Sequence, residues 1–315
     1  MRVLITGASG FVGRYLSAYL LSKKNVKVYG LIRARSKNSL MPGVIPVRAD
    51  LLSKTSMLRL LRKIKPDRIY HLAAQSSVGR SWKEPKKTFE VNVGGTRSLL
   101  EAARLVCPGA RILLACSADE YGASGRLYPK VPEDAPLEPL NPYGVSKLVQ
   151  DLLGRHYFSI YGLPIVRMRA FNHVGPGQAT TFVVASFARQ VADILAGRQK
   201  PEIKVGNLKV VRDFSDVRDV VRAYYLALEK GKAGEAYNVA SGRPRRVADI
   251  LQYYLRASSV KIKVYRDRTR LRASDIPRLV GDPRKLERAT GWRPRIRFET
   301  TLCDILRHAQ KGNDV

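Results

Sequence analysis

The sequence predicts an α/β protein built on a doubly wound parallel sheet, and two observations support this prediction. Short apolar segments alternate with helical patterns from the first residue, and a glycine-rich turn follows the first apolar segment directly. Parallel strands need long crossover connections, which are usually helices, so this alternation indicates repeated strand–helix–strand units. The expected strands and helices of this part are, in chain order, 2–7, 11–23, 27–33, 54–64, 68–74, 86–105, 111–117, 143–161 and 164–172.

The pattern changes after Asn172, where glycine and proline turns become frequent. Asp282 as N-cap, Pro283 at the first helical position and Gly291 as the stop predict one short helix near the C-terminus. The other elements expected in this part are helices near 181–197, 217–230 and 246–257, with strands near 202–205 and 209–214. We expect a main sheet domain of residues 1–171 with a returning segment of about 212–240, and a smaller lobe of residues 172–211 and 241–315.

Composition indicates a folded globular protein. The chain has 315 residues, of which 45% are hydrophobic and 26% are charged. No apolar run reaches the roughly 20 residues that a membrane-spanning helix needs. The opening MRVLITGASG reaches small residues and glycine before a secretory segment could form. We therefore expect a soluble, cytoplasmic protein without a membrane span.

The cysteines and histidines do not indicate a metal site. Cys107, Cys116 and Cys303 lack the spacing of a disulfide framework or of a CxxC metal site. The four histidines form no HxH or HExxH pair. We expect no metal.

A glycine-rich turn lies between the first expected strand and the first expected helix. Gly7, Gly10 and Gly13 follow at three-residue spacing in TGASGFVG, which also contains Phe11 and Val12. The first glycine permits a tight turn, the second lets backbone approach a pyrophosphate, and the third allows the helix to pack closely on the strand. Because a helix N-terminus attracts negative charge, this placement predicts a dinucleotide-binding site rather than an ordinary turn.

The end of the second strand favours NADP(H) over NAD. NAD-binding proteins carry an acidic residue about 20 positions beyond the glycine motif, whereas this strand ends with Arg33 and Arg35. Guanidinium groups can pair with a 2'-phosphate through forked hydrogen bonds, although in so basic a chain they could also be surface charges. Asp50, which precedes Leu51, could accept a hydrogen bond from the adenine amino group or simply cap a loop.

A second motif indicates oxidoreductase chemistry. Tyr143 and Lys147 stand four residues apart in NPYGVSK, which places both on one face of the expected helix. A phenol titrates near ~10 in water, so we expect the Lys147 ammonium to lower the pKa of Tyr143 for proton transfer at neutral pH. Lys147 could also hold the nicotinamide ribose. Ser117 ends a strand upstream and would orient the oxygen being oxidised or reduced.

Two carboxylates follow this serine in CSADEYG. Asp119 or Glu120 could do acid–base work on a neighbouring carbon. Both could equally be polar loop residues.

These motifs together resemble the extended short-chain dehydrogenase/reductase family, in its nucleotide-sugar branch, over nearly the whole chain. Within the branch, FNHVGPGQ, FVVASFARQ and LRASDIP look most like reductases of GDP-6-deoxy-4-keto-mannose, which form GDP-rhamnose and are kin of the GDP-mannose 4,6-dehydratases. The resemblance implies a Rossmann domain, NADP(H) and a GDP-linked sugar. The other segments that carry it are HLAAQSSV, NVGGT, VGNLKVVRDFSDVRDVVRAY, YNVASG, LRASDIPRLVGD and TGWRPR.

The resemblance also implies roles for individual residues. Asn172 and Arg212 would contact the substrate diphosphate, and cationic and amide donors suit that task. The other residues to which it gives roles are Arg272 and Asp275 at the nucleotide's diphosphate and ribose, Lys204 and Asn207 near guanosine, His71, Leu72, Ala73 and Ala74 along the cofactor ribose, and Asn92 bracing the central strands.

One departure bears on the reaction. Asp119 falls where the dehydratases carry a glutamate, and its shorter side chain disfavours dehydration without excluding it. We therefore expect NADPH-dependent reduction of a C4 ketone, giving GDP-rhamnose, with Tyr143 as proton donor. GDP-mannose 4,6-dehydration is the nearest alternative, and a nucleotide-sugar 4-epimerase is less favoured. An alternative of another class is a basic NADP(H)-binding protein that regulates or tethers nucleic acid.

The formal net charge is +31, from 57 Lys and Arg against 26 Asp and Glu. Anionic cofactor and substrate, nucleic acid or lipid, or a solvated surface could each account for part of this excess. The basic residues are dispersed and not interleaved with aromatic ones, so we expect no specific nucleic-acid partner.

The resemblance implies a homodimer, with a tetramer possible, paired through helices of about 88–105 and 143–161 as a four-helix seam. Both helices carry apolar stripes that could form this seam or face the sheet. The residues of these stripes are Leu99, Leu100, Ala103, Val149, Leu152 and Leu153.

Overall fold

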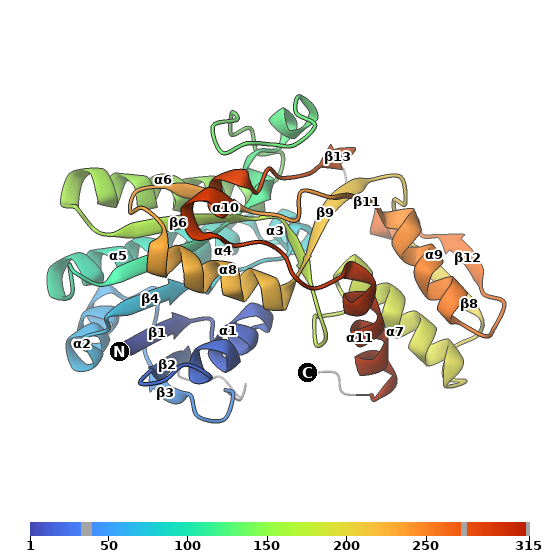
Figure 1. The fold of residues 1–315 in the computed structure, drawn as a ribbon, viewed down its shortest axis with the longest axis horizontal. Coiled ribbons are helices and arrows are strands. Elements are labelled where there is room, and N and C mark those ends of the chain that lie inside the picture. The colour runs from blue at the N-terminus through green and yellow to red at the C-terminus, as the bar shows by residue number, and fades with distance from the viewer. Residues whose placement is uncertain (33–39, 272–275, 313–315) are drawn as a thin grey trace.

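A seven-stranded sheet forms the centre of the protein in the computed structural model, which describes residues 1–32, 40–271 and 276–312 (Figure 1). All of its pairings are parallel, in the order β10-β6-β5-β4-β1-β2-β3. The strands are β1 (Arg2–Thr6), β2 (Lys27–Ile32), β3 (Ile45–Arg48), β4 (Arg68–His71), β5 (Arg111–Ser117), β6 (Ile165–Ala170) and β10 (Ala236–Val239).

Helices cover both faces of this sheet. Leu16 of α1 (Phe11–Leu21) and Val220 of α8 (Val217–Lys230) belong to one buried core, on the face toward the viewer in Figure 1. The opposite face is packed by α2 (Lys54–Ile64), α5 (Gly95–Val106) and α6 (Pro142–Tyr161), which contribute Met57, Leu99 and Tyr157. The doubly wound prediction is therefore confirmed.

The segment expected as one helix over 86–105 has three parts. They are α4 (Pro85–Phe89), a π-helical turn (Glu90–Gly94) and α5, and the short α3 (Val78–Lys83) precedes them. Asn92 lies in the π-helical turn and is fully buried. Single π-turns inside helices are frequent at functional sites.

A smaller group of elements packs beside the sheet, at the right of Figure 1. Strand β9 lies at its centre and pairs with β7, β11 and β13, while β8 pairs with β12. Phe214 of β9 lies in a core shared with three helices. The elements are β7 (Asn172–Val174), α7 (Val183–Leu195), β8 (Glu202–Val205), β9 (Val211–Asp216), β11 (Pro244–Arg246), α9 (Val247–Ala257), β12 (Lys263–Arg266), β13 (Arg278–Leu279) and α11 (Phe298–Gln310). Helix α10 (Arg284–Thr290) instead contacts α8 and β10.

The C-terminal third does not stay within this lobe. Leu286 of α10 and Trp292 lie in the core formed by α1 and α8, so this stretch packs against the main sheet domain. The physical reason is an apolar indole that is fully buried and donates its ring N–H to the Asp219 carbonyl at 2.9 Å.

Helix ends follow the expected chemistry with one difference. Asn141 caps α6 by accepting a hydrogen bond from the Gly144 N–H at 2.8 Å. Helix α10 has Pro283 rather than Asp282 as its N-cap residue, but Asp282 still accepts from the Arg284 N–H at 3.0 Å. Within the described ranges, no helix combines the length and apolar character needed to cross a membrane.

Asp219 fastens the returning C-terminal segment to α8. Its buried carboxylate accepts the backbone N–H groups of Arg295 and Ile296, both at 2.9 Å, and pairs with Arg222 at 2.9 Å. Removing one partner from such a buried group leaves the others unsatisfied.

We predict that Asp219→Ala lowers the free energy of unfolding by about 2–4 kcal/mol, because two backbone N–H groups and one guanidinium lose a buried acceptor. Urea unfolding measures the change. Asp134→Ala is the matched control, since Asp134 is exposed and its loss should cost less than ~0.5 kcal/mol. Equal destabilisation by both variants would contradict the prediction.

Candidate active site

The side chains of Ser117, Tyr143 and Lys147 come together at the carboxyl edge of the sheet. Ser117 is the last residue of β5, and Tyr143 lies in the first turn of α6. Ser117 hydrogen-bonds to the Tyr143 phenol and is 6% exposed. Carboxyl edges of parallel strands are where ligands of doubly wound proteins bind.

Lys147, one helical turn after Tyr143, contacts the same strand. Its buried Nζ donates to the Ala115 carbonyl at 2.6 Å and to Gln150 Oε1 at 2.9 Å. Burial lowers the pKa of this ammonium, and the negative charge of Glu120 opposes the lowering. Through its hydrogen bond to Ala115, Lys147 links α6 to β5.

The expected acidification of Tyr143 is wrong for this arrangement. The pKa of the phenol is raised above its usual value, first by burial and then by the negative charge of Asp119, while the hydrogen bond from Ser117 partly opposes the rise. Lys147 does not offset these effects because its ammonium is directed to Ala115 and Gln150. At neutral pH the phenol keeps its proton.

The two carboxylates after Ser117 lie in different surroundings. Asp119 accepts hydrogen bonds from the Ser117 hydroxyl at 3.3 Å and from Asn141 Nδ2 at 3.1 Å, so it stays beside the phenol. Glu120 is fully buried and accepts from the Ser117 backbone N–H at 2.8 Å. Glu120 is thus a capping group for the end of β5, which is the polar-loop alternative of the sequence analysis.

A buried network of charges lies beneath this site. Asp151 of α6 pairs with Arg167 and with Arg169 Nε at 3.0 Å, both on β6, and Glu120 lies 3.5 Å from Arg169. The sequence analysis missed it, although arginines at alternate positions of an otherwise apolar strand, IVRMRA, were a signal. The ligand-type side chains of Cys116, Glu120 and Asp151 lie within 4.8 Å of one another, but the arginines already supply the positive charge there.

The glycine turn has the shape that a dinucleotide pyrophosphate needs. Gly7 has φ +74°, and a Cβ on Gly13 would come within 2.1 Å of the Gly7 carbonyl oxygen. Helix α1 starts there with Gly10 as N-cap and no side-chain cap, so its first N–H groups are open to an anion. A Cβ on Gly7 would also meet Ala73 N at 2.9 Å and Leu72 C at 3.0 Å, which places Leu72 and Ala73 against the turn. These residues fit a bound dinucleotide.

His71 and Asn92 support this region from inside. His71 is buried between Thr6 and Thr96, with hydrogen bonds of 2.7 and 2.9 Å, and burial lowers its pKa to about 3. Asn92 accepts from Gln75 N at 2.7 Å and donates to Ser146 Oγ at 2.9 Å. It therefore joins the segment after β4 to α6 rather than bracing the central strands.

Three residues are expected at the adenosine end of the cofactor, namely Arg33, Arg35 and Asp50. Arg33 and Arg35 lie outside the described residues. Asp50 Oδ1 accepts from the Leu52 N–H at 3.0 Å, so its carboxylate caps a loop and is exposed. This contact uses one oxygen and leaves the adenine prediction untested.

The residues assigned to the substrate lie on the smaller lobe. Asn172 on β7 is exposed and its strand pairs with β9, which carries the half-buried Arg212. Lys204 is exposed on β8, and Asn207 follows that strand. Arg272 and Asp275 lie outside the described residues. The structure thus brings Asn172 and Arg212 onto neighbouring strands, and places Lys204 on a separate sheet with Asn207 in the segment after it.

Comparison with known proteins identifies the family. The GDP-mannose 4,6 dehydratase family model matches residues 4–305. The chain is 35% identical to GDP-6-deoxy-D-mannose reductase of Pseudomonas aeruginosa over 305 residues, covering 97% of this chain and 96% of that protein. Its fold is similar to that of RMD from Pseudomonas aeruginosa complexed with NADPH, with a TM-score of 0.85, 34% identity and 99% of each chain covered.

Another solved structure is also similar to this chain. UDP-glucose 4-epimerase of Thermotoga maritima with UDP-glucose gives a TM-score of 0.88 at 26% identity, with 99% of each chain covered. The resemblance drawn from the motifs is confirmed by these matches. The chain belongs to the GDP-mannose 4,6-dehydratase family.

Proposed function

We propose that this protein uses NADPH to reduce the C4 ketone of a GDP-4-keto-6-deoxymannose type sugar, giving GDP-rhamnose. The observation that carries the proposal is a protonated phenol, Tyr143, held beside Ser117 at the edge of a sheet whose glycine turn fits a dinucleotide. The 35% identity to a GDP-6-deoxy-D-mannose reductase over nearly the whole chain supports this substrate class.

The dinucleotide would be held by Gly7, Gly10 and Gly13 with the N-terminus of α1, and by Lys147 at the nicotinamide ribose. When bound, NADPH supplies the hydride that the ketone carbon accepts. Ser117 would hold the ketone oxygen by hydrogen bonding. Tyr143 would donate its phenolic proton to that oxygen as negative charge develops there. Reduction needs the phenol in its protonated form, and the raised pKa keeps it in that form at neutral pH.

Dehydration of GDP-mannose is the second candidate, because the family model carries that name. It requires Tyr143 first to accept a proton from the C4 hydroxyl, which a phenol of raised pKa does poorly. It also needs a carboxyl to assist loss of water, and Asp119 is already bonded to Ser117 and Asn141. Both points favour reduction.

One pair of incubations tests the function directly. Purified protein is mixed with GDP-mannose alone, and separately with the 4-keto-6-deoxy intermediate plus NADPH, and products are followed by mass and by NADPH absorbance. We expect NADPH consumption with gain of two hydrogens only in the second mixture. Loss of water from GDP-mannose without net NADPH consumption would establish the dehydratase. A product with the same mass as its substrate would establish a 4-epimerase.

Tyr143→Phe should lower kcat by about 10²- to 10⁴-fold, because it removes the proton donor. NADPH affinity should change less than about threefold, since the ring remains. Fluorescence titration and steady-state kinetics measure the two effects. Tyr265→Phe is the matched control, because Tyr265 is exposed on β12 and its hydroxyl should not matter. Unchanged turnover in Tyr143→Phe would refute the assignment.

The pH dependence of reduction follows from the raised pKa of Tyr143. The active, protonated phenol should persist as pH rises, so kcat should not fall between about pH 6 and about pH 9. Saturating substrate and NADPH are needed, so that binding does not contribute. A decline with a midpoint near neutral pH, lost in Tyr143→Phe, would mean that the phenol is acidified after all.

We also propose a homodimer that forms through α6 and the neighbouring helix α5. On α5, Leu99, Leu100 and Ala103 are fully buried in the core, which is the alternative in which this stripe faces the sheet. Exposed apolar side chains do remain on these helices. They are Leu105 on α5, with 48% exposure, and Leu152, Ile160 and Tyr161 on α6, with 49%, 63% and 44%.

Leu152→Glu should shift the protein toward monomer in light-scattering measurements, because it places a charge in the centre of the proposed seam. Leu127→Glu is the control, since Leu127 is 72% exposed outside both helices. A monomeric wild-type protein, or equal dissociation by both variants, would contradict the dimer.

The three free cysteines support placing the protein in the cytoplasm.

A further inference from the structure

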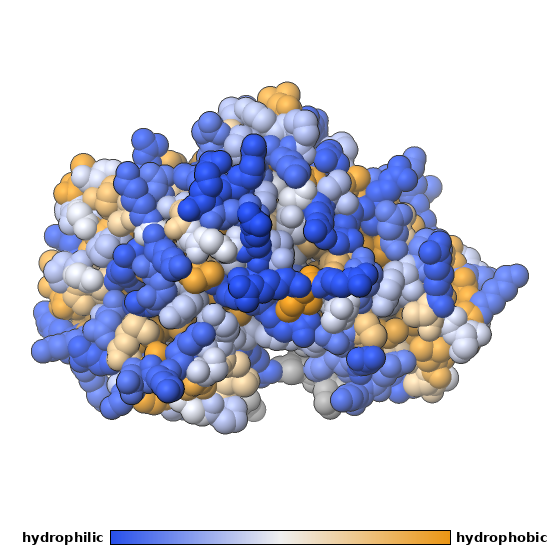
Figure 2. Space-filling model, in the orientation of Figure 1, coloured by the Kyte–Doolittle hydropathy of each residue, from blue (hydrophilic) through white to orange (hydrophobic). Residues whose placement is uncertain are grey.

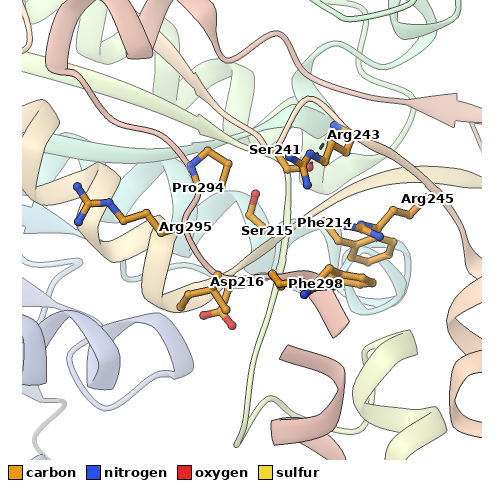
Figure 3. A pocket seen from close by; sticks show the side chains of 11 residues that line it. Phe214, Ser215, Asp216, Ser241, Arg243, Arg245, Pro294, Arg295 and Phe298 are labelled. Carbon is orange, nitrogen blue, oxygen red and sulfur yellow. Dashed lines mark hydrogen bonds between the residues drawn. The ribbon is translucent and has the colours of Figure 1, made fainter. Parts of the chain in front are cut away.

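A pocket outside the proposed active site lies between the end of β9, the segment after β10 and the segment that leads into α11. Its volume is about 160 Å³, many times the ~10–15 Å³ that one water molecule needs. Figure 3 shows the side chains around it. Ser117, Tyr143, Lys147 and Arg212 do not line it, so it is separate from the proposed reaction site. Its lining residues include Ser215, Asp216, Arg243, Arg245, Arg295 and Arg297.

The lining is strongly positive. Four arginines line the pocket, and among the described lining residues Asp216 is the one carboxylate. Asp216 pairs with Arg218 at 2.7 Å, and Arg218 also pairs with Asp304 at 2.9 Å. Asp216 accepts from the Thr301 hydroxyl at 2.7 Å as well, so its carboxylate oxygens are bonded to groups that do not line the pocket.

The arginines themselves are weakly paired. Glu299 lies beside the pocket, 3.7 Å from Arg245 and 4.0 Å from Arg297. In the part of the chain that the structure describes, Arg243 and Arg295 make no ion pair. Arg243 and Arg295, which are both exposed, are therefore available to a ligand.

Two buried polar atoms at this pocket have no hydrogen-bond partner within the described chain. Ser215 is 2% exposed, and its Oγ is unpartnered. In Figure 3 this hydroxyl points into the space between Pro294 and Ser241. The second atom is Arg245 Nε. Burial of unsatisfied polar groups is costly, so both atoms indicate a polar occupant.

A helix N-terminus faces the same space. Helix α11 begins at Phe298, its N-cap residue is Arg297, and it has no side-chain cap. Both residues line the pocket. The first N–H groups of a helix are unsatisfied and carry partial positive charge, which favours an anion.

We propose that this pocket binds an oxyanion of the phosphate class, as inorganic phosphate or as the phosphate group of an ester. Such a group carries acceptor oxygens in several directions, which the guanidinium groups, the Ser215 hydroxyl and the α11 N–H groups can donate to together. Arg245 pairs in register with Arg212 of β9, so the occupant would sit one strand away from the residue assigned to the substrate diphosphate.

Calorimetric titration of the NADPH-saturated protein with inorganic phosphate, at constant ionic strength, tests the proposal. We expect saturable binding that weakens about tenfold or more when Arg243→Gln and Arg295→Gln are combined. Ser215→Ala should weaken binding about threefold or more without removing charge. The matched control combines Arg62→Gln and Arg256→Gln, two exposed arginines on α2 and α9, and should bind within twofold of the wild type.

Further arms identify the occupant and its place. Mannose 6-phosphate as a second probe distinguishes the sources: tighter binding than phosphate, weakened by the same variants, assigns the pocket to a phosphate ester, and equal or weaker binding assigns it to the free ion. Three results would overturn the proposal. These are the absence of saturable binding, equal weakening by the control pair, and full competition by GDP, which would make the pocket part of the nucleotide site.

Discussion

The buried ion pairs between α6 and β6 hold the reactive part of this protein in place. Asp151 of α6 bonds to Arg167 and Arg169, and Lys147 of the same helix reaches back to β5. Buried charges are tolerated only when they are paired and hydrogen-bonded, so the helix has one favourable position on the sheet. Tyr143 lies one turn before Lys147 on the same helix, so its position on the sheet is set by the same contacts. Its distance from Ser117 is therefore fixed by charges that never meet a substrate.

This network also explains why the phenol and the ammonium behave differently from the sequence expectation. Spacing on a helix predicts that Tyr143 and Lys147 share a face, and they do. It does not predict which group the ammonium binds. The Ala115 carbonyl and Gln150 take its hydrogen bonds, while Asp119 adds negative charge near the phenol. The pKa of Tyr143 is raised first by burial and then by the charge of Asp119, and the spacing of the motif shows neither.

Much of the fold could be predicted because its signals are local. The glycine turn, the alternation of strands and helices and the caps at Asn141 and Gly291 each depend on a few adjacent residues. The family also followed from such motifs. The site was predictable as a set of residues, since Ser117, Tyr143 and Lys147 stand in recognisable segments.

The rest depended on contacts between distant residues. Nothing near Glu120 shows that it would be buried against Arg169, and nothing near Leu99 distinguishes a core-facing stripe from an interface. The pocket around Ser215 joins residues of β9, the turn after β10 and the approach to α11, three segments far apart in sequence. Local pattern cannot reveal an unpartnered hydroxyl, because the partner is missing only after the chain has folded.

The path of the chain between the two lobes has a consequence for biosynthesis. Strand β10, at the edge of the main sheet, is made only after the first segments of the smaller lobe, and Trp292 fills the core beside α8 later still. An emerging chain cannot complete its first domain while the ribosome is still translating the second. Final folding must therefore wait until nearly all of the polypeptide has left the exit tunnel, and a nascent chain stalled before Trp292 would expose the apolar surface of α8 to chaperones.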